Sequence, residues 1–239
     1  MGSSECESKV TWIAMAPPPA KLPMHSRTEN CSHACANSKI RAGSRLMATR
    51  YDRRMMTQRH LLWVRHALPA PDPSTPAREW PLTPEGREES ARLAQTLMGL
   101  RPPVSVVTSD ERKAVETAEA VCEALDLGPA EVSADLREVE RPWTDGDYRS
   151  AAREYLRSGS APGWEPRHEV LDRVSGALAE HWRPQGTTIA VGHGLAMSIW
   201  AADAVEGLDV VQFWDSLTFP DAWLFAEDSA TFRRVVGPA

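Results

Sequence analysis

The chain has 239 residues, of which 42% are hydrophobic and 25% charged, a composition typical of globular proteins. No run of eighteen apolar residues occurs, so we expect no membrane-spanning segment. The net charge is −6, and because residues 1–55 are basic, the remaining residues are more acidic still. An acidic globular part argues against a broad contact with nucleic acid phosphates.

The first 55 residues differ from the rest of the chain. They hold nine Lys and Arg against four Asp and Glu, a run of three prolines, and no sustained helical or strand periodicity. We therefore expect residues 1–55 to be a disordered or dispensable N-terminal extension and residues 56–239 to form the folded domain. Only one of the four cysteines lies in that domain, so the domain has no pair of cysteines that could form a disulfide. This favours a reducing, cytoplasmic location.

The domain begins with a short apolar run. Residues 61–64 predict a buried strand, which stops at Arg65 and His66 and is followed by a loop with five prolines. Thr83 and Pro84 then begin a helix, because threonine caps helices and proline suits the first helical position.

Further strands and helices alternate along the chain. Strands are predicted at 104–107, 131–133 and 187–191, with Arg112 in the first turn of the helix after one strand and His193 directly after another. Alternating strands and helices predict an α/β fold, with a mostly parallel central sheet between two layers of helices.

Two segments stand apart from this alternation. Residues 141–164 are rich in Trp, Gly, Pro and Ser, and we expect them to leave the core and extend over the site. Residues 210–236 alternate between apolar and polar, which predicts two or three antiparallel edge strands.

Arg65, His66, Arg112 and His193 each stand just past a predicted strand. Parallel strands bring such ends to one edge of the sheet, so we expect these side chains to converge. Two arginines, two histidines and helix N-termini form an electropositive pocket suited to a phosphoryl group. The cations should also lower the pKa of a nearby histidine and keep it neutral and nucleophilic.

Five segments in this order resemble the motifs of the histidine phosphatase superfamily, which is the phosphoglycerate-mutase-like family, and most closely its phosphatase branch. The segments are Leu62-Trp63-Val64-Arg65-His66-Ala67, Leu82-Thr83-Pro84-Glu85-Gly86, Ser109 to Ala118, Leu136-Arg137-Glu138 and Val191-Gly192-His193-Gly194. The resemblance covers roughly residues 60–200 and implies a phosphoglycerate-mutase-like fold.

The resemblance also implies roles for individual residues. His66 resembles the nucleophile that becomes phosphohistidine, and Arg65, Arg112 and His193 resemble the phosphate-binding residues, with His193 also stabilising the transferring group. Glu138 resembles the acid that protonates the leaving oxygen and later activates water, and Glu140, two residues on, is the alternative.

These assignments predict a metal-independent phosphomonoester hydrolase acting on a small phosphorylated metabolite or a phosphoprotein. No HExxH, EF-loop or Walker pattern suggests a metal, so we expect no cofactor. One alternative is a phosphoglycerate-type mutase, which the short 141–164 segment disfavours. Another is a catalytically silent phosphate-binding or interaction module, which the intact Arg65, His66, Arg112 and His193 disfavour. We expect substrate specificity to reside in the loops 68–81 and 141–164.

Overall fold

The computed structural model describes residues 59–98, 104–143, 146–226 and 232–236. All of them belong to the unit Thr49–Ala239, and the expected boundary between residues 55 and 56 lies outside the described residues. In the part of the chain that the structure describes, no helix is both long enough and apolar enough to cross a membrane.

A six-stranded sheet forms the centre of the domain, with the strand order β3-β2-β4-β1-β5-β6. The strands β3, β2, β4 and β1 are parallel, and β5 and β6 continue the sheet in antiparallel fashion. Their bounds are β1 Arg59–Arg65, β2 Val104–Ser109, β3 Glu131–Ser133, β4 Gly186–Gly192, β5 Asp221–Ala226 and β6 Phe232–Val236. This confirms the expected α/β fold with a mostly parallel sheet.

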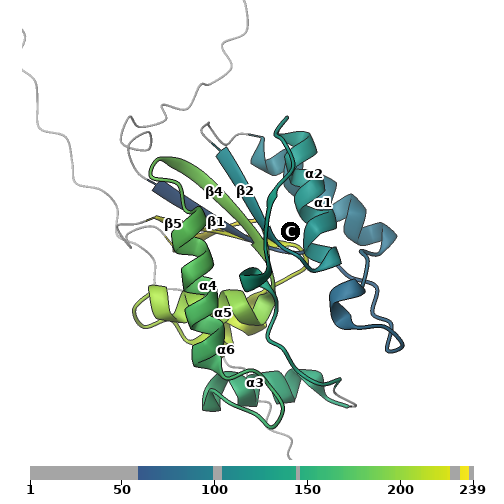
Figure 1. Ribbon diagram of the computed structural model, residues 1–239, viewed down its shortest axis with the longest axis vertical. Coiled ribbons are helices and arrows are strands. Elements are labelled where there is room, and N and C mark those ends of the chain that lie inside the picture. Colours follow the sequence, from purple (N-terminus) through teal and green to yellow (C-terminus); the bar gives the residue numbers. More distant parts are fainter. Residues whose placement is uncertain (1–58, 99–103, 144–145, 227–231, 237–239) are drawn as a thin grey trace, which may run out of the picture. The chain divides into compact units, whose positions relative to one another are not determined.

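Helices cover both faces of the sheet (Figure 1). One face carries α1 and α2, and α3 to α6 lie on the other. The helices are α1 Pro84–Leu97, α2 Arg112–Ala124, α3 Tyr148–Ser158, α4 Arg167–His181, α5 Gly194–Ala204 and α6 Val210–Ser216, with short 3₁₀ turns at Ala77–Glu79 and Ala134–Leu136.

The apolar run of β1 supplies both halves of the core because successive side chains of a strand point to opposite faces. Leu61 and Trp63 pack with the helices α3 to α6, whereas Leu62 and Val64 pack with α1 and α2. All four side chains are fully buried. The hydrophobic run that predicted this strand is therefore shared between two separate clusters, one in each helical layer.

The expectation of strands throughout residues 210–236 is wrong at its beginning. Residues 210–216 form the helix α6, because the side chain of Asp209 accepts hydrogen bonds from the backbone amides of Val211 and Gln212 and caps the first turn. Phe213 and Trp214 are buried from this helix. The antiparallel strands β5 and β6 follow, as expected for the rest of the segment.

The loop after β1 is fixed against the start of α1. Thr83 caps α1 by accepting the amide of Gly86, and its own amide donates to the carbonyl of Leu68. A Cβ atom at Gly86 would lie only 2.3 Å from that carbonyl oxygen. Glycine is thus required here for the close approach of the loop to the start of α1.

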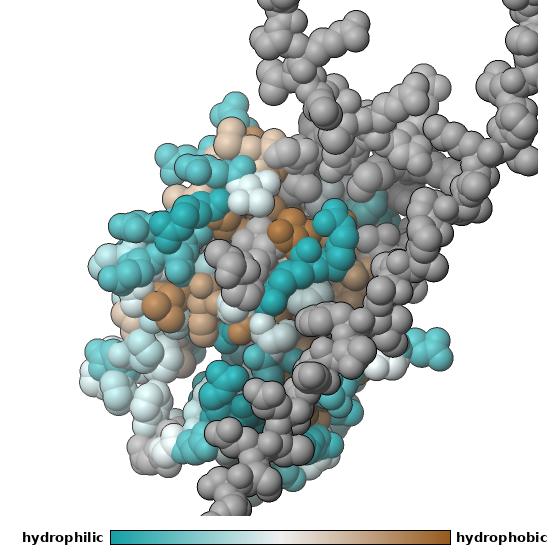
Figure 2. All heavy atoms as spheres, turned by 180° about the vertical axis from the view of Figure 1, so that it is seen from behind, coloured by the Kyte–Doolittle hydropathy of each residue, from teal (hydrophilic) through white to brown (hydrophobic). Residues whose placement is uncertain are grey.

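Large hydrophobic side chains are scattered over the described surface. Leu68, Met98, Val132 and Trp143 are the exposed ones. On the face shown in Figure 2, hydrophilic side chains occupy most of the described surface, and hydrophobic ones appear in smaller areas between them.

Candidate active site

The ends of β1, β2 and β4 meet at the carboxyl edge of the sheet and bring two histidines together. His66 follows β1, and its backbone amide donates to the carbonyl of Gly192 at the end of β4. His193 follows Gly192 directly and stands at the N-cap position of α5, without a capping hydrogen bond from its side chain. The two rings lie edge to face, with centroids 5.1 Å apart, and both are buried. The expected convergence of His66 and His193 is therefore observed.

The imidazole of His66 is held in one tautomer. Its Nδ1 atom lies 2.7 Å from the carbonyl oxygen of Ala67, and since a carbonyl only accepts, Nδ1 carries the hydrogen and Nε2 keeps a lone pair. Burial, followed by the charges of His193, Lys113 and Arg65, holds the pKa of His66 well below its usual value. The ring is consequently neutral at neutral pH.

His193 contacts the end of β2. Its Nε2 atom lies 2.9 Å from the hydroxyl oxygen of Ser109. The same hydroxyl oxygen accepts a hydrogen bond from the backbone amide of Glu111. Its Nδ1 atom is buried and has no hydrogen-bond partner among the described residues. Burial, with Lys113, Arg173 and Arg65 as additional causes, lowers the pKa of His193 well below its usual value.

Arg65 ends β1 beside this pair. Its Cζ atom lies 3.6 Å from the ring centroid of Phe219, and Nη1 donates to the carbonyl of Leu217 at 3.3 Å. Its Nε atom is buried without a partner in the described ranges. Burial lowers the pKa of Arg65 to about 10, while the charge of Glu138 opposes that shift, so the guanidinium stays charged at neutral pH.

The structure does not bring Arg112 to the histidines. Its side chain is 56% exposed, and Nε donates to Glu116 one turn further along α2 at 2.8 Å. The next residue, Lys113, is buried instead, donates from Nζ to the carbonyl of Ala77 at 2.8 Å and acts electrostatically on both His66 and His193. Lys113 therefore occupies the place in which we expected Arg112.

The buried face of α2 explains this exchange. Lys113 precedes Thr117 by four residues, and Thr117 is buried and donates to the carbonyl of Lys113 at 2.8 Å. Residues four apart on a helix share one face. The phase of the buried face is thus the sequence signal that could have distinguished Lys113 from Arg112.

Glu111 is a site residue that the sequence reasoning missed. Its carboxylate is buried, forms an ion pair with Lys113 and accepts the backbone amide of Glu138 at 2.8 Å. The oxygen that accepts the amide of Glu138, Oε1, also lies 3.6 Å from Nε2 of His193. A buried acid thus stands beside the cation and the second histidine of the cluster.

Glu138 lies at the start of α5. Its two carboxylate oxygens accept the amides of Leu195 and Ala196, at 3.1 and 3.0 Å, and so satisfy free N–H groups at the N-terminus of that helix. Its charge also acts on Arg65 and on Tyr148 of α3. Glu140 is exposed, and its backbone is tied to Glu165. Of the two acids, only Glu138 lies with the cluster.

Two loops come together next to Lys113. Trp80, from the loop after β1, contacts Trp143, from the segment 141–164, with ring centroids 5.9 Å apart. The ammonium of Lys113 lies 5.9 Å from the centre of the Trp80 ring. Both loops that we expected to set specificity therefore border the site. In the described part of the chain, no group of three or more His, Cys, Asp and Glu side chains is placed to hold a metal ion.

The fold and this site define an α/β protein whose buried histidines and cations meet at the carboxyl edge of a mostly parallel sheet. Residues 61–222 match the family model of the histidine phosphatase superfamily (branch 1). The chain belongs to the histidine phosphatase superfamily.

Solved structures share this fold. A mycobacterial glucosyl-3-phosphoglycerate phosphatase is similar at 22% identity with a TM-score of 0.59, over 76% of this chain and 99% of that one. An alpha-ribazole phosphatase from Shigella flexneri is similar at 20% identity with a TM-score of 0.57, over 73% and 95%. At such identities the likeness shows the fold. A comparison with curated protein sequences finds no match.

Proposed function

We propose that the chain is a metal-independent phosphomonoester hydrolase that acts through a phosphohistidine intermediate on His66. The observation that carries this proposal is the fixed tautomer of His66, whose Nδ1 donates to the carbonyl of Ala67 and whose Nε2 keeps its lone pair. A neutral imidazole beside the cations Arg65 and Lys113 is suited to attack a phosphoryl group, since phosphoryl transfer depends chiefly on positioning and charge neutralisation.

Arg65, Lys113 and His193 are the phosphate-binding residues in this proposal, with Lys113 in place of Arg112. Apart from the amide of Glu111, which the hydroxyl of Ser109 accepts, Nε2 of His193 is the one hydrogen-bond partner of this hydroxyl in the described residues, so we assign the hydroxyl hydrogen to a bond donated to Nε2. The hydrogen of His193 then stands on Nδ1. This buried N–H and Nε of Arg65 are donors without partners in the described residues, which the oxygens of a bound phosphoryl group would satisfy.

Two steps complete the reaction. First, Nε2 of His66 bonds to phosphorus and the bond from phosphorus to the leaving oxygen breaks, while Glu138, which enters this step in its protonated form, donates its proton to that oxygen. Water then attacks phosphorus and gives a proton to Glu138, and the bond between nitrogen and phosphorus breaks to release inorganic phosphate. Glu138 is preferred to Glu140 for the acid and base roles because its carboxylate lies beside Arg65 and the start of α5.

Hydrolysis of para-nitrophenyl phosphate in excess EDTA tests the proposal with a matched pair of variants. His66→Asn should lower kcat by about a thousandfold or more, because it removes the nucleophile. His60→Asn is the control, because His60 is an equally buried histidine of β1 that lies six residues, or roughly 20 Å, from the site. Equal activity of His66→Asn and wild type, or loss of activity in EDTA, would contradict the proposal.

Trapping the phosphorylated protein separates the hydrolase from its alternatives. A hydrolase should carry acid-labile phosphate on His66 during turnover and pass it to water. A phosphoglycerate-type mutase would instead need a bisphosphorylated primer and return the group to its substrate. A silent binding module would bind phosphate without labelling. The descriptions of the two solved structures as phosphatases agree with the first outcome.

A further inference from the structure

The segment that carries Glu138 is not held in place by a helix or a strand of its own. A short 3₁₀ turn at Ala134–Leu136 precedes it, and residues 137–140 belong to neither a helix nor a strand. The backbone groups of these residues therefore need partners other than those of a helix or a sheet ladder. The position of the proposed acid consequently depends on side chains that other elements place around this segment.

Arg173, in the middle of α4, binds three backbone carbonyls of the segment. Its Nη1 atom donates to the carbonyls of Asp135 and Arg137, both at 2.8 Å, and Nη2 donates to the carbonyl of Glu138 at 3.2 Å. Nε and Nη2 also donate to the two oxygens of Glu165, at 2.7 and 2.8 Å. Each of the five N–H groups of the guanidinium thus has an acceptor, and the planar group holds the three carbonyls in one arrangement.

Glu165 orients Arg173 and also binds the segment itself. Its Oε2 atom accepts the backbone amide of Glu140 at 3.1 Å, and its own amide donates to the carbonyl of Glu140 at 2.8 Å. Burial alone would raise the pKa of Glu165, but the hydrogen bonds from Arg173 and from the amide of Glu140 lower it below its usual value. The carboxylate is therefore charged at neutral pH and pairs with the guanidinium.

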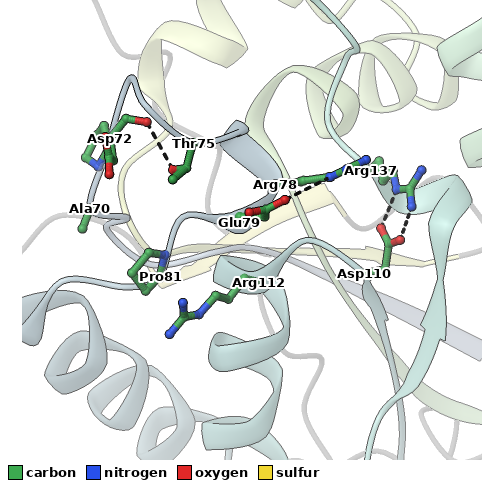
Figure 3. Close-up of a pocket in the computed structure, with 10 residues that line it drawn as sticks. Ala70, Asp72, Thr75, Arg78, Glu79, Pro81, Asp110, Arg112 and Arg137 are labelled. Carbon is green, nitrogen blue, oxygen red and sulfur yellow. Dashed lines mark hydrogen bonds and ion pairs between the residues drawn. The ribbon is translucent and has the colours of Figure 1, made fainter.

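The residues just before α2 hold the opposite side of the segment. Glu111 accepts the amide of Glu138 at 2.8 Å. Arg137 donates from Nε and Nη2 to the carboxylate of Asp110 at the wall of a pocket, as the two dashed lines in Figure 3 show. The side chains of Arg137 and Asp110 are 45% and 30% exposed, against 19% and 15% for Arg173 and Glu165. Solvent therefore screens the pair on the side of α4 less.

We propose that Arg173 and Glu165 position the carboxyl group of Glu138 for proton transfer to the leaving group. The carboxylate of Glu138 binds the start of α5, and Arg173 binds the carbonyl of the same residue, so the two ends of Glu138 are fixed separately. Arg173 is a positioning residue, because it binds the backbone and not the substrate. This inference rests on the proposed function, since it takes Glu138 as the acid.

Two substrates with different leaving groups test this role. para-Nitrophenolate is a stable anion that leaves without a proton, whereas the more basic phenolate of phenyl phosphate depends on the acid. The measured quantity is the ratio of kcat/KM for para-nitrophenyl phosphate to kcat/KM for phenyl phosphate. A partly unfolded variant loses both activities in proportion, so this ratio separates positioning from stability.

Glu138→Gln should raise the ratio by about a hundredfold, because it removes the acid. Arg173→Gln should raise it by about tenfold, because the backbone of Glu138 can then shift. Arg173→Lys keeps the positive charge that acts on His193 but lacks the planar fork, so it should raise the ratio by at least about threefold. Glu165→Gln should also raise it by about threefold, because Arg173 loses its counter-ion, and this variant carries the test if Arg173→Gln does not fold.

Arg167→Gln is the matched control and should keep the wild-type ratio. Arg167 belongs to the same helix and donates from Nη1 to a backbone carbonyl at 2.8 Å, but that carbonyl is on Leu156 of α3. A raised ratio in Glu138→Gln with a wild-type ratio in the variants of Arg173 and Glu165 would overturn this inference alone. A wild-type ratio in Glu138→Gln as well would overturn the acid role of Glu138 in the proposed function, and the inference with it.

Discussion

Oε1 of Glu111 lies 3.6 Å from Nε2 of His193, and the other oxygen of the same carboxylate forms an ion pair with Lys113. All three side chains are buried. The negative charge of Glu111 therefore offsets much of the positive charge that Lys113 brings to the cluster. In the proposed function a bound phosphate would compete with Glu111 for that ammonium, so the acid would limit how tightly phosphate is held.

Glu111→Gln should accordingly bind inorganic phosphate more tightly. The amide keeps an oxygen that accepts the backbone amide of Glu138, but it removes the charge that neutralises Lys113. We expect the inhibition constant of phosphate to fall by about tenfold, as partly screened charge interactions of a few kcal/mol allow. Product inhibition assays measure this constant. Glu123→Gln, at an exposed glutamate of the same helix, should leave it unchanged, and an unchanged constant in Glu111→Gln would contradict the argument.

The two buried histidines should make the stability of the domain depend on pH. Both His66 and His193 have pKa values well below the usual one, chiefly because of burial. In the unfolded chain they bind protons below a pH of about 6.5, whereas the folded protein does not. The unfolded state then binds more protons, so stability falls as the pH drops below that value. The expected loss is about 1.4 kcal/mol per pH unit for each histidine.

Urea unfolding at pH 7.5, 6.5 and 5.5 measures this dependence, in a range where Arg65, with a pKa of about 10, stays charged. His193→Gln should show about half of the wild-type slope, because it leaves a single buried histidine. His168→Gln, at an exposed position, should keep the full slope. A free energy of unfolding that is constant from pH 7.5 to 5.5 would show that the buried histidines bind protons in the folded state.

The strands of the parallel sheet and the positions of His66 and His193 could be predicted from the sequence, because both depend on local sequence signals. The apolar run 61–64 must be buried, and a parallel arrangement must bring the ends of such strands to one edge. His66 and His193 follow their strands directly, so their placement needed no knowledge of packing. The helix at 210–216 was missed because its signal is the cap at Asp209, whereas the alternation of the segment indicated a strand.

The choice of side chains within the helix α2 could not be predicted in the same way. Arg112 and Lys113 are both cations in its first turn, and a shift of one residue turns a side chain by about 100° around the helix. In the structure Val115 and Leu125 are only partly buried, whereas Thr117, Ala118 and Cys122 are buried, so the apolar residues of this segment do not by themselves fix the phase of the buried face. The role of Glu111 was beyond the sequence because its contacts join Lys113 to residues distant in the chain.

Gly194→Ala should impair the site through Arg65. A Cβ atom at this position would lie 3.0 Å from Nε and 3.1 Å from Cζ of Arg65, whose guanidinium is also held by the Phe219 ring and the carbonyl of Leu217. The guanidinium must therefore move away from the position where its free Nε would meet a phosphoryl oxygen. Since displacement by about 1 Å can cost a hundredfold in rate, we expect kcat/KM for para-nitrophenyl phosphate to fall by at least about tenfold.

Gly176→Ala is the matched control for this substitution. Gly176 lies in α4, where an added Cβ atom meets nothing within 4 Å. It should leave kcat/KM unchanged and raise the free energy of unfolding by about 0.5–1 kcal/mol, because alanine favours a helix interior over glycine. Steady-state kinetics and urea unfolding on both variants separate the two effects. If Gly194→Ala kept full activity, the position of the Arg65 guanidinium would not matter to the reaction.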